Sequence, residues 1–167
     1  MVDTKMVNYS VKSGDLLPDF ELISTTGKLV RLNSIAGKTV LFFIYPKDDT
    51  PSCTKEAQNF SNYEAQFAEL GVQVFGISKD SIQSHNKFSS KYSLTVELLS
   101  DESVDFIKSI GAWVEKQMYG KTYMGVERTS LLISDHGKLL KIWRKVRVPG
   151  HVEEVLETIK NISLKSS

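Results

Sequence analysis

The sequence contains one cysteine among its 167 residues, Cys53. A single cysteine excludes an internal disulfide and a cysteine-rich zinc site. The three histidines, His85, His136 and His151, are scattered along the chain without the spacing of metal ligands. We therefore expect no metal and no cofactor, and the lone thiol needs another explanation.

Neither sign of charge dominates, because 21 lysines and arginines stand against 20 aspartates and glutamates, which leaves a formal net charge of +1. This balance predicts no binding to nucleic acid or to an anionic membrane surface. Long apolar runs are also missing: the longest, residues 40–45, has six residues, whereas a helix that spans a bilayer needs about 20. The first residues lack the apolar core of a signal peptide. We expect a cytoplasmic protein without membrane spans and with a flexible lead-in, residues 1–13.

The composition and the periodicity favour one α/β domain over residues 1–167. With 41% hydrophobic and 10% aromatic residues, the chain can fill one core without disulfides. Residues 38–45 are apolar on both faces, which is typical of a central strand covered on both sides, and residues 72–77 repeat the pattern. Between them, apolar residues three or four apart predict one helix that ends at Gly71: Ala57, Phe60, Tyr63, Phe67 and Leu70. This is a β-helix-β unit with parallel strands.

The rest of the chain completes a mixed sheet. In chain order we expect a hairpin of residues 20–22 and 29–32 before this unit, helices 81–92 and 101–110 around a strand 96–99 after it, a hairpin of 129–133 and 139–146, and a last helix opened by Pro149 and Gly150. Ser81 and Asp101 are the expected N-caps. The order predicts a thioredoxin-like fold, with a mixed central sheet and helices on both faces. Ligands bind such sheets at the carboxyl ends of the strands.

Cys53 follows the central strand at that edge. Thr50 and Pro51 suit the N-cap and the first position of a helix, which places Cys53 in the first turn. There the sulfur lies near free backbone N–H groups and the positive end of the helix dipole, which favour the reactive thiolate. Lone cysteines are more often buried and structural. Polar neighbours surround this one, however, and we expect an accessible nucleophile.

The residues around Cys53 resemble the peroxiredoxin family. The stretch PKDDTPSC, residues 46–53, matches the family signature Pro-x-x-x-Thr/Ser-x-x-Cys. Further stretches are similar to the bacterioferritin comigratory protein (PrxQ) branch, among them VFGISKDSIQSHNKF, MYGKTYMGVERTSLLI and WRKVRVPGHVEEVL. The likeness runs from about residue 14 to about residue 162. It implies a thioredoxin-like peroxiredoxin fold and the reduction of hydrogen peroxide and organic hydroperoxides at Cys53.

The resemblance also assigns the other residues of the site. Thr50 matches the threonine of the signature, and Arg128 matches the arginine that precedes a late strand in the family. During the reaction negative charge moves from sulfur to the departing oxygen. We therefore expect the Cys53 N–H, the Thr50 hydroxyl and the Arg128 guanidinium to hold the two peroxide oxygens. Pro46 and Pro51 then shape the loop and shield the thiolate.

Two residues of the following turn bear on the rest of the reaction cycle. Glu56 resembles the family carboxylate that orients the arginine, and a solvated surface charge remains equally open. Gln58 stands where many PrxQ proteins carry a resolving cysteine. We favour a natural glutamine over an engineered one, because serine or alanine is the usual replacement. The sulfenic acid of Cys53 then needs an external thiol, from thioredoxin or from glutaredoxin with glutathione, or it oxidises further.

Two other functions stay open at this point. A redox sensor or a holdase would use the same thiol without turnover. A thiol hydrolase or transferase needs a histidine base near Cys53, which the sequence does not suggest. For the oligomeric state we expect a monomer or a weak homodimer.

The other conspicuous side chains have structural interpretations. We expect a surface or capping role for His85 and His151, core packing for Trp113, Met118, Tyr119 and Tyr123, and the face of an edge strand for Arg144, Lys145 and Arg147.

Overall fold

The computed structural model describes residues 11–166 of the chain, with side chains up to residue 162. Most of the predicted lead-in, residues 1–10, lies outside the described residues. Its last part is anchored, because Val11 packs against the hydrophobic core and its carbonyl oxygen accepts a hydrogen bond of 3.2 Å from Arg144 Nη2. Among the described residues, no helix has both the length and the apolar character needed to cross a membrane.

Strands and helices follow one another as the sequence predicts. The strands are β1 (Glu21–Ser24), β2 (Leu29–Arg31), β3 (Thr39–Ile44), β4 (Val72–Ser78), β5 (Glu97–Ser100), β6 (Trp113–Met118), β7 (Lys121–Val126), β8 (Thr129–Ile133) and β9 (Leu139–Trp143). The helices are η1 (Leu32–Ile35), α2 (Pro51–Asn62), α3 (Glu64–Glu69), α4 (Ile82–Tyr92), α5 (Asp105–Ser109) and α6 (His151–Ser166). Each predicted strand is present, the helix predicted before Gly71 is divided into α2 and α3, and η1, β6 and β7 are additional.

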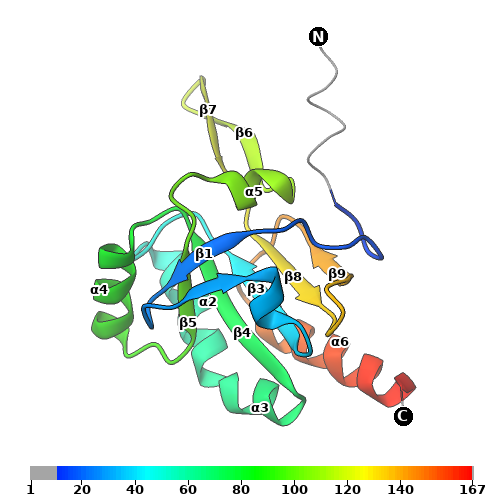
Figure 1. Cartoon of the computed structure of the whole chain (residues 1–167). Helices are drawn as coiled ribbons and strands as arrows, with labels where there is room; N and C mark the ends of the chain where they lie inside the picture. Colours follow the sequence, from blue (N-terminus) through cyan, green and yellow to red (C-terminus); the bar gives the residue numbers. More distant parts are fainter. Residues whose placement is uncertain (1–10, 167) are drawn as a thin grey trace.

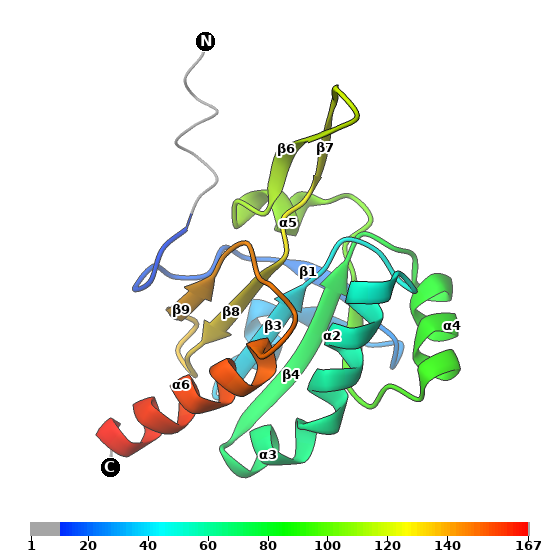
Figure 2. The same ribbon diagram turned by 180° about the vertical axis from the view of Figure 1, so that it is seen from behind.

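One mixed sheet forms the centre of the molecule, in the strand order β2-β1-β5-β4-β3-β8-β9. β3 runs parallel to β4, and β4 to β5, whereas the other neighbours are antiparallel. Successive side chains of β3 enter two different hydrophobic cores, one on each face of the sheet. α2, α4 and α6 cover one face and α5 covers the other (Figure 1, Figure 2). The predicted mixed sheet with helices on both faces is confirmed.

The helix expected across residues 57–70 is two helices, α2 and α3, which meet at Tyr63. Ser61 and Asn62 precede the break. Such residues favour helix ends because their side chains compete for backbone hydrogen bonds, and Ser61 Oγ accepts the Thr95 N–H at 3.0 Å. Gly71 follows α3 with a φ of 77°, as the sequence predicts for a helix end.

The two predicted N-caps have different outcomes. Ser81 is confirmed, because its Oγ accepts the Ser84 N–H at 3.1 Å at the start of α4. α5 begins later than expected, at Asp105. Asp101 still binds this helix, since its Oδ2 accepts the Ile107 N–H at 2.8 Å. The carboxylate therefore stabilises the helix start from outside the cap position.

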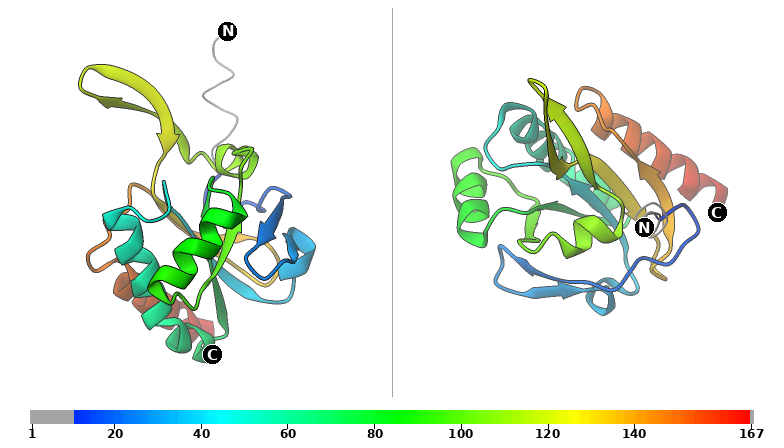
Figure 3. Two further views of the ribbon diagram at one scale, coloured as in Figure 1. Left: turned by 90° about the vertical axis from the view of Figure 1, so that its left-hand side faces the viewer. Right: turned by 90° about the horizontal axis from the view of Figure 1, so that it is seen from above.

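β6 and β7 form a separate two-stranded hairpin that projects from the body of the molecule (Figure 3). Its turn residues, Tyr119 and Gly120, both have positive φ, 53° and 77°, which is the geometry of a tight two-residue turn. Met118, Tyr119 and Tyr123 are exposed, Tyr119 to 95%. Core packing is therefore wrong for these three residues. Trp113, at the base of β6, packs against the core as expected.

The basic residues Arg144, Lys145 and Arg147 lie beyond the end of β9, the edge strand of the sheet. Their predicted place on the face of that strand is wrong. The segment stays beside the residue that precedes β8, because the Val146 N–H donates to the Arg128 carbonyl oxygen at 3.0 Å.

Candidate active site

The carboxyl end of β3 leads into a short loop and then into α2. Thr50 stands directly before the helix in extended conformation, with φ −100° and ψ 156°, and Pro51 is the first helical residue, as predicted. The Thr50 hydroxyl donates a hydrogen bond of 2.8 Å to the Lys47 carbonyl oxygen, and it accepts no helix N–H. Thr50 therefore occupies the N-cap position while its side chain closes the loop.

Cys53 lies in the first turn of α2, where free backbone N–H groups and the helix dipole favour an anion. The residue is only 1% exposed and belongs to the same core as Ala57 and Phe60. The expectation of an accessible thiol is therefore wrong for this structure. The prediction was based on the polar residues beside Cys53. Two of them, Ser52 and Lys55, are exposed on the solvent side of this turn, whereas Cys53 is not.

Arg128 joins Cys53 to Glu56. It directly precedes β8, and its Nη2 donates to Cys53 Sγ at 3.4 Å while its Nη1 donates to Glu56 Oε1 at 2.6 Å. Glu56 is fully buried. The interpretation of Glu56 as a solvated surface charge is wrong, and its carboxylate instead fixes the guanidinium group beside the sulfur.

Burial sets the electrostatics of this pair. It raises the pKa of Glu56 from 4.5 to about 7, against the attraction of Arg128. Burial alone lowers the pKa of Arg128, but the negative charges of Glu56 and Cys53 outweigh it, so that this pKa lies above its ordinary value. Glu56 Oε2 has no hydrogen-bond partner among the described residues. The site thus pairs a permanent cation with a carboxylate that titrates near neutral pH.

His151, the first residue of α6, contacts Ser130 of β8. Its Nε2 and Ser130 Oγ are 2.8 Å apart, and Trp143 and Phe60 pack edge-on against the ring. Burial, with a smaller contribution from the charge of Arg128, lowers the pKa of His151 from 6.5 to about 4. The ring is therefore neutral near pH 7. The surface alternative expected for His151 is wrong. His151 stands four residues before Val155 and eight before Ile159, so the apolar period of the last helix did indicate its burial.

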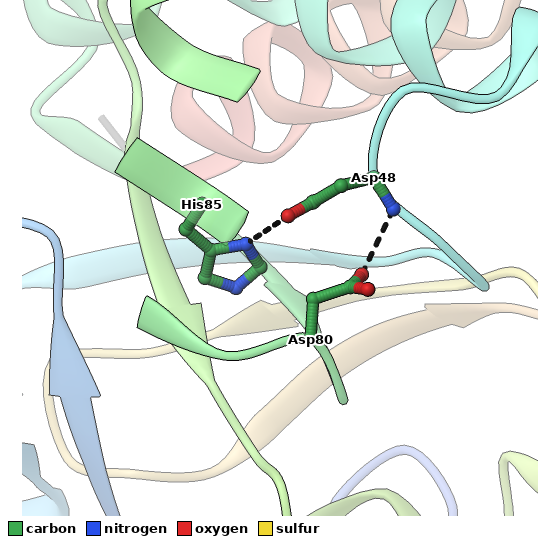
Figure 4. A group of neighbouring side chains, drawn as sticks. All are labelled: Asp48, Asp80 and His85. Carbon is green, nitrogen blue, oxygen red and sulfur yellow. Dashed lines mark hydrogen bonds and ion pairs between the residues drawn. The ribbon is translucent and has the colours of Figure 1, made fainter. Parts of the chain in front are cut away.

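His85 is also buried, contrary to the predicted surface role. Its Nδ1 contacts Asp48 Oδ2 at 2.8 Å and its Nε2 contacts the Leu99 carbonyl oxygen at 2.9 Å, while the Asp48 N–H donates to Asp80 Oδ2 at 2.8 Å (Figure 4). Possible metal-ligand atoms of His85, Asp48 and Asp80 lie within 4.8 Å of one another. Because hydrogen bonds already engage these atoms, the cluster is better described as a structural network than as a metal site.

Known proteins resemble this chain over most of its length. The profile of the AhpC/TSA family matches residues 13–142. The chain belongs to the AhpC/TSA family. The putative peroxiredoxin bcp of Coxiella burnetii is 44% identical over 147 residues, which cover 88% of this chain and 97% of that protein. Peroxiredoxin Bcp of Bacillus subtilis is 41% identical over 156 residues, which cover 93% of this chain and 99% of that protein.

Solved structures of peroxiredoxins share the fold. The bacterioferritin comigratory protein of Xanthomonas campestris, studied for alkyl peroxide reduction, has a TM-score of 0.84 and 34% identity, covering 90% of this chain and 98% of that one. A PrxQ mutant from Xylella fastidiosa has a TM-score of 0.87 and 32% identity, covering 92% and 98%. This peroxiredoxin is therefore a thiol-dependent peroxidase of the PrxQ branch with a thioredoxin-like fold. Its single cysteine makes it a one-cysteine member.

The structure of this peroxiredoxin also places the remaining predicted residues. Pro46 and Pro51 stand at the two ends of the loop before the thiol. Pro46 is half-buried and Pro51 is exposed. Gln58 is half-buried in α2, five residues after Cys53. Cα atoms five residues apart in an α-helix are about 8.7 Å apart, beyond the roughly 7 Å that a disulfide tolerates. Even a cysteine at this position would not reach Cys53 while α2 is intact.

Proposed function

We propose that Cys53 is the nucleophile of this peroxidase and that Thr50 and Arg128 bind its hydroperoxide substrate. The contact of 3.4 Å between Arg128 Nη2 and Cys53 Sγ supports this most directly. A cation in contact with sulfur favours the thiolate over the thiol. The guanidinium group has five N–H donors, so that donors remain for a peroxide after Cys53 and Glu56 are bound.

In the first half-reaction the Cys53 thiolate attacks the terminal oxygen of the hydroperoxide. A sulfur–oxygen bond forms and the oxygen–oxygen bond breaks. The electron pair of the broken bond leaves with the other oxygen as hydroxide or alkoxide, which takes up one proton. Sulfur is oxidised from thiolate to sulfenic acid, and the peroxide is reduced to water or to an alcohol. Arg128 and the Cys53 N–H stabilise the charge as it moves to the departing oxygen.

Thr50 and Glu56 orient the reactants. Because the Thr50 hydroxyl hydrogen is engaged with the Lys47 carbonyl oxygen at 2.8 Å, the Thr50 oxygen is available to accept the O–H of an incoming hydroperoxide. Glu56 holds the Arg128 guanidinium group through the 2.6 Å contact. Pro46 and Pro51 restrict the backbone on the two sides of this loop.

In the second half-reaction an external thiol attacks the sulfenic acid. A disulfide forms between Cys53 and that thiol, and water leaves. A second thiol then displaces Cys53 as thiolate and forms a disulfide with the first. We infer that the reductant is thioredoxin, or glutaredoxin with glutathione, and that the protein works in the cytoplasm as a monomer or a weak homodimer. Hydrogen peroxide and organic hydroperoxides are both expected as substrates, since the Xanthomonas campestris relative is described for alkyl peroxide reduction.

Steady-state consumption of hydrogen peroxide, with each candidate reductant in turn, tests this function. We expect many equivalents per chain with at least one reductant, and none with the Cys53→Ser variant. Consumption that stops at one equivalent with every reductant would instead identify a sensor or holdase. Unchanged consumption by Cys53→Ser would refute the role of Cys53. A thiol hydrolase is disfavoured because the hydrogen bond to Cys53 Sγ among the described residues comes from Arg128 and not from a histidine.

A further inference from the structure

Asp48, in the loop before α2, is bound by three side-chain donors. Its Oδ1 accepts the Tyr45 hydroxyl at 2.7 Å, and its Oδ2 accepts the Ser84 hydroxyl at 2.8 Å. The same Oδ2 contacts His85 Nδ1 at 2.8 Å (Figure 4). Ser84 and His85 belong to α4. These contacts engage both oxygen atoms of the buried Asp48 side chain. The loop is therefore attached to α4 through a buried, hydrogen-bonded carboxyl group.

His85 fills the space between Asp48 and β5. Its Nε2 lies 2.9 Å from the Leu99 carbonyl oxygen, which can only accept a hydrogen bond, so Nε2 carries a hydrogen. Its Nδ1 lies 2.8 Å from Asp48 Oδ2, and the ring is fully buried. Removing the ring therefore leaves the buried carboxyl group of Asp48 without one of its partners, which is unfavourable.

Asp49 attaches the next residue of the loop to the same helix. Its φ of 58° lies in the left-handed region, which aspartate tolerates better than most residues. Lys91 Nζ at 2.8 Å and the Tyr92 hydroxyl at 2.6 Å bind its carboxylate. Thr50 and Pro51 follow directly. The turn that starts α2 is thus held by contacts to α4 at two consecutive residues.

We propose that His85 is a positioning residue for the peroxidase reaction. It holds Asp48, and through Asp48 it fixes the loop that carries Thr50 and the first helical turn that carries Cys53. Both hydrogen-bonding atoms of its ring are occupied by Asp48 and Leu99, so His85 acts through the loop and does not touch the reacting atoms. The role rests on the proposed functions of Cys53 and Thr50.

Two substitutions of His85 separate positioning from plain stability. In His85→Asn the amide nitrogen lies near the place of Nδ1 and can still donate to Asp48, whereas in His85→Gln it lies near the place of Nε2 and can donate only to Leu99. Both variants lose the ring and its packing. Rates of the Cys53 reaction with hydrogen peroxide, followed by stopped-flow fluorescence at several peroxide concentrations, should fall about tenfold or more in His85→Gln, because small displacements of reacting groups are expensive. His85→Asn should stay within about threefold of the wild type, since one neutral hydrogen bond is retained.

Urea denaturation of both variants and the exposed control His136→Gln complete the comparison. Equal loss of stability in the two His85 variants with unequal rates supports positioning. Equal rates in the two variants, or a His85→Gln rate equal to that of the wild type, would overturn it. If neither variant folds, Ser84→Ala tests the same attachment, because it removes another donor to Asp48. It should slow the peroxide reaction about threefold, and an unchanged rate would count against the proposal.

A failure of this proposal is distinct from a failure of the peroxidase function, because in the second case the wild type itself would show no peroxide reaction that depends on Cys53.

Discussion

Replacing Glu56 by glutamine is predicted to change how the stability of the protein depends on pH. Glu56 is fully buried, and its pKa lies at about 7 in the folded protein against 4.5 for an unperturbed glutamate. Glutamine has nearly the same shape and can still accept the hydrogen bond from Arg128, but it does not titrate. The substitution therefore isolates the proton that folding places on this carboxyl group.

The sign and the size follow from the two pKa values. A carboxyl group that binds its proton more tightly in the folded state stabilises that state fully below its unfolded pKa, 4.5, and this contribution is lost as the pH rises through about 7. At about 1.4 kcal/mol for each pKa unit, the difference corresponds to about 3 kcal/mol of unfolding free energy. Relative to Glu56→Gln, the wild type should therefore become less stable by about this amount between about pH 4.5 and pH 8.

Urea denaturation followed by circular dichroism, at intervals across this pH range, measures the difference. Other groups titrate equally in both proteins, so the difference between the two curves reports on Glu56. Glu157→Gln, at an exposed position of α6, is the matched control and should give a curve parallel to that of the wild type. Parallel curves for Glu56→Gln as well would refute the argument that burial raises this pKa.

Three further outcomes are expected. When graded peroxide is added without thiol, Cys53 should gain two oxygen atoms, which intact mass measurement detects, because no second cysteine traps the sulfenic acid. A stable sulfenic acid under excess peroxide would contradict this. Gly76→Ala should lower the unfolding free energy measured in urea by about 1–3 kcal/mol, because the added Cβ would lie 2.6 Å from Phe43 Cζ and 2.8 Å from Leu98 Cδ2. An unchanged midpoint of urea denaturation would show that β4 has room for this methyl group. Tyr119 has a φ of 53°, a conformation that asparagine adopts more readily than tyrosine, so Tyr119→Asn should stabilise the β6–β7 turn by about 1 kcal/mol. Hydrogen exchange of the hairpin amides should then slow, and faster exchange would argue against strain at Tyr119.

The sequence was sufficient for the elements that have a clear period or a clear boundary. Residues 38–45 and 72–77 have apolar residues on both faces, and both segments form central strands, β3 and β4. The helix start at Pro51 was also predictable, because proline has one favoured helical position. These features depend on neighbours in the chain, which is what a single sequence displays.

Features that depend on distant contacts were harder to predict. Cys53 is an exception, because it stands four residues before Ala57 and seven before Phe60 and so shares the buried face of α2 with them at helical spacing. The burial of His85 depends on Asp48 and Leu99, which come from other elements. The hairpin of β6 and β7 has large side chains on exposed positions, so its sequence looked like core. For the contacts of His85 and for the hairpin, the partner or the solvent, and not the local pattern, decides the outcome.

The enclosure of Cys53, at 1% exposure, sets different size limits for its two reaction partners. A hydroperoxide presents two small oxygen atoms, whereas a protein thiol brings a whole surface to the sulfur. Attack by such a thiol on the sulfenic acid therefore requires that the first turn of α2 moves aside. At high reductant concentration we expect the rate of this step to stop rising and to equal the rate of that opening. Above that concentration, the lifetime of the oxidised protein is a property of its own fold and no longer depends on the amount of reductant.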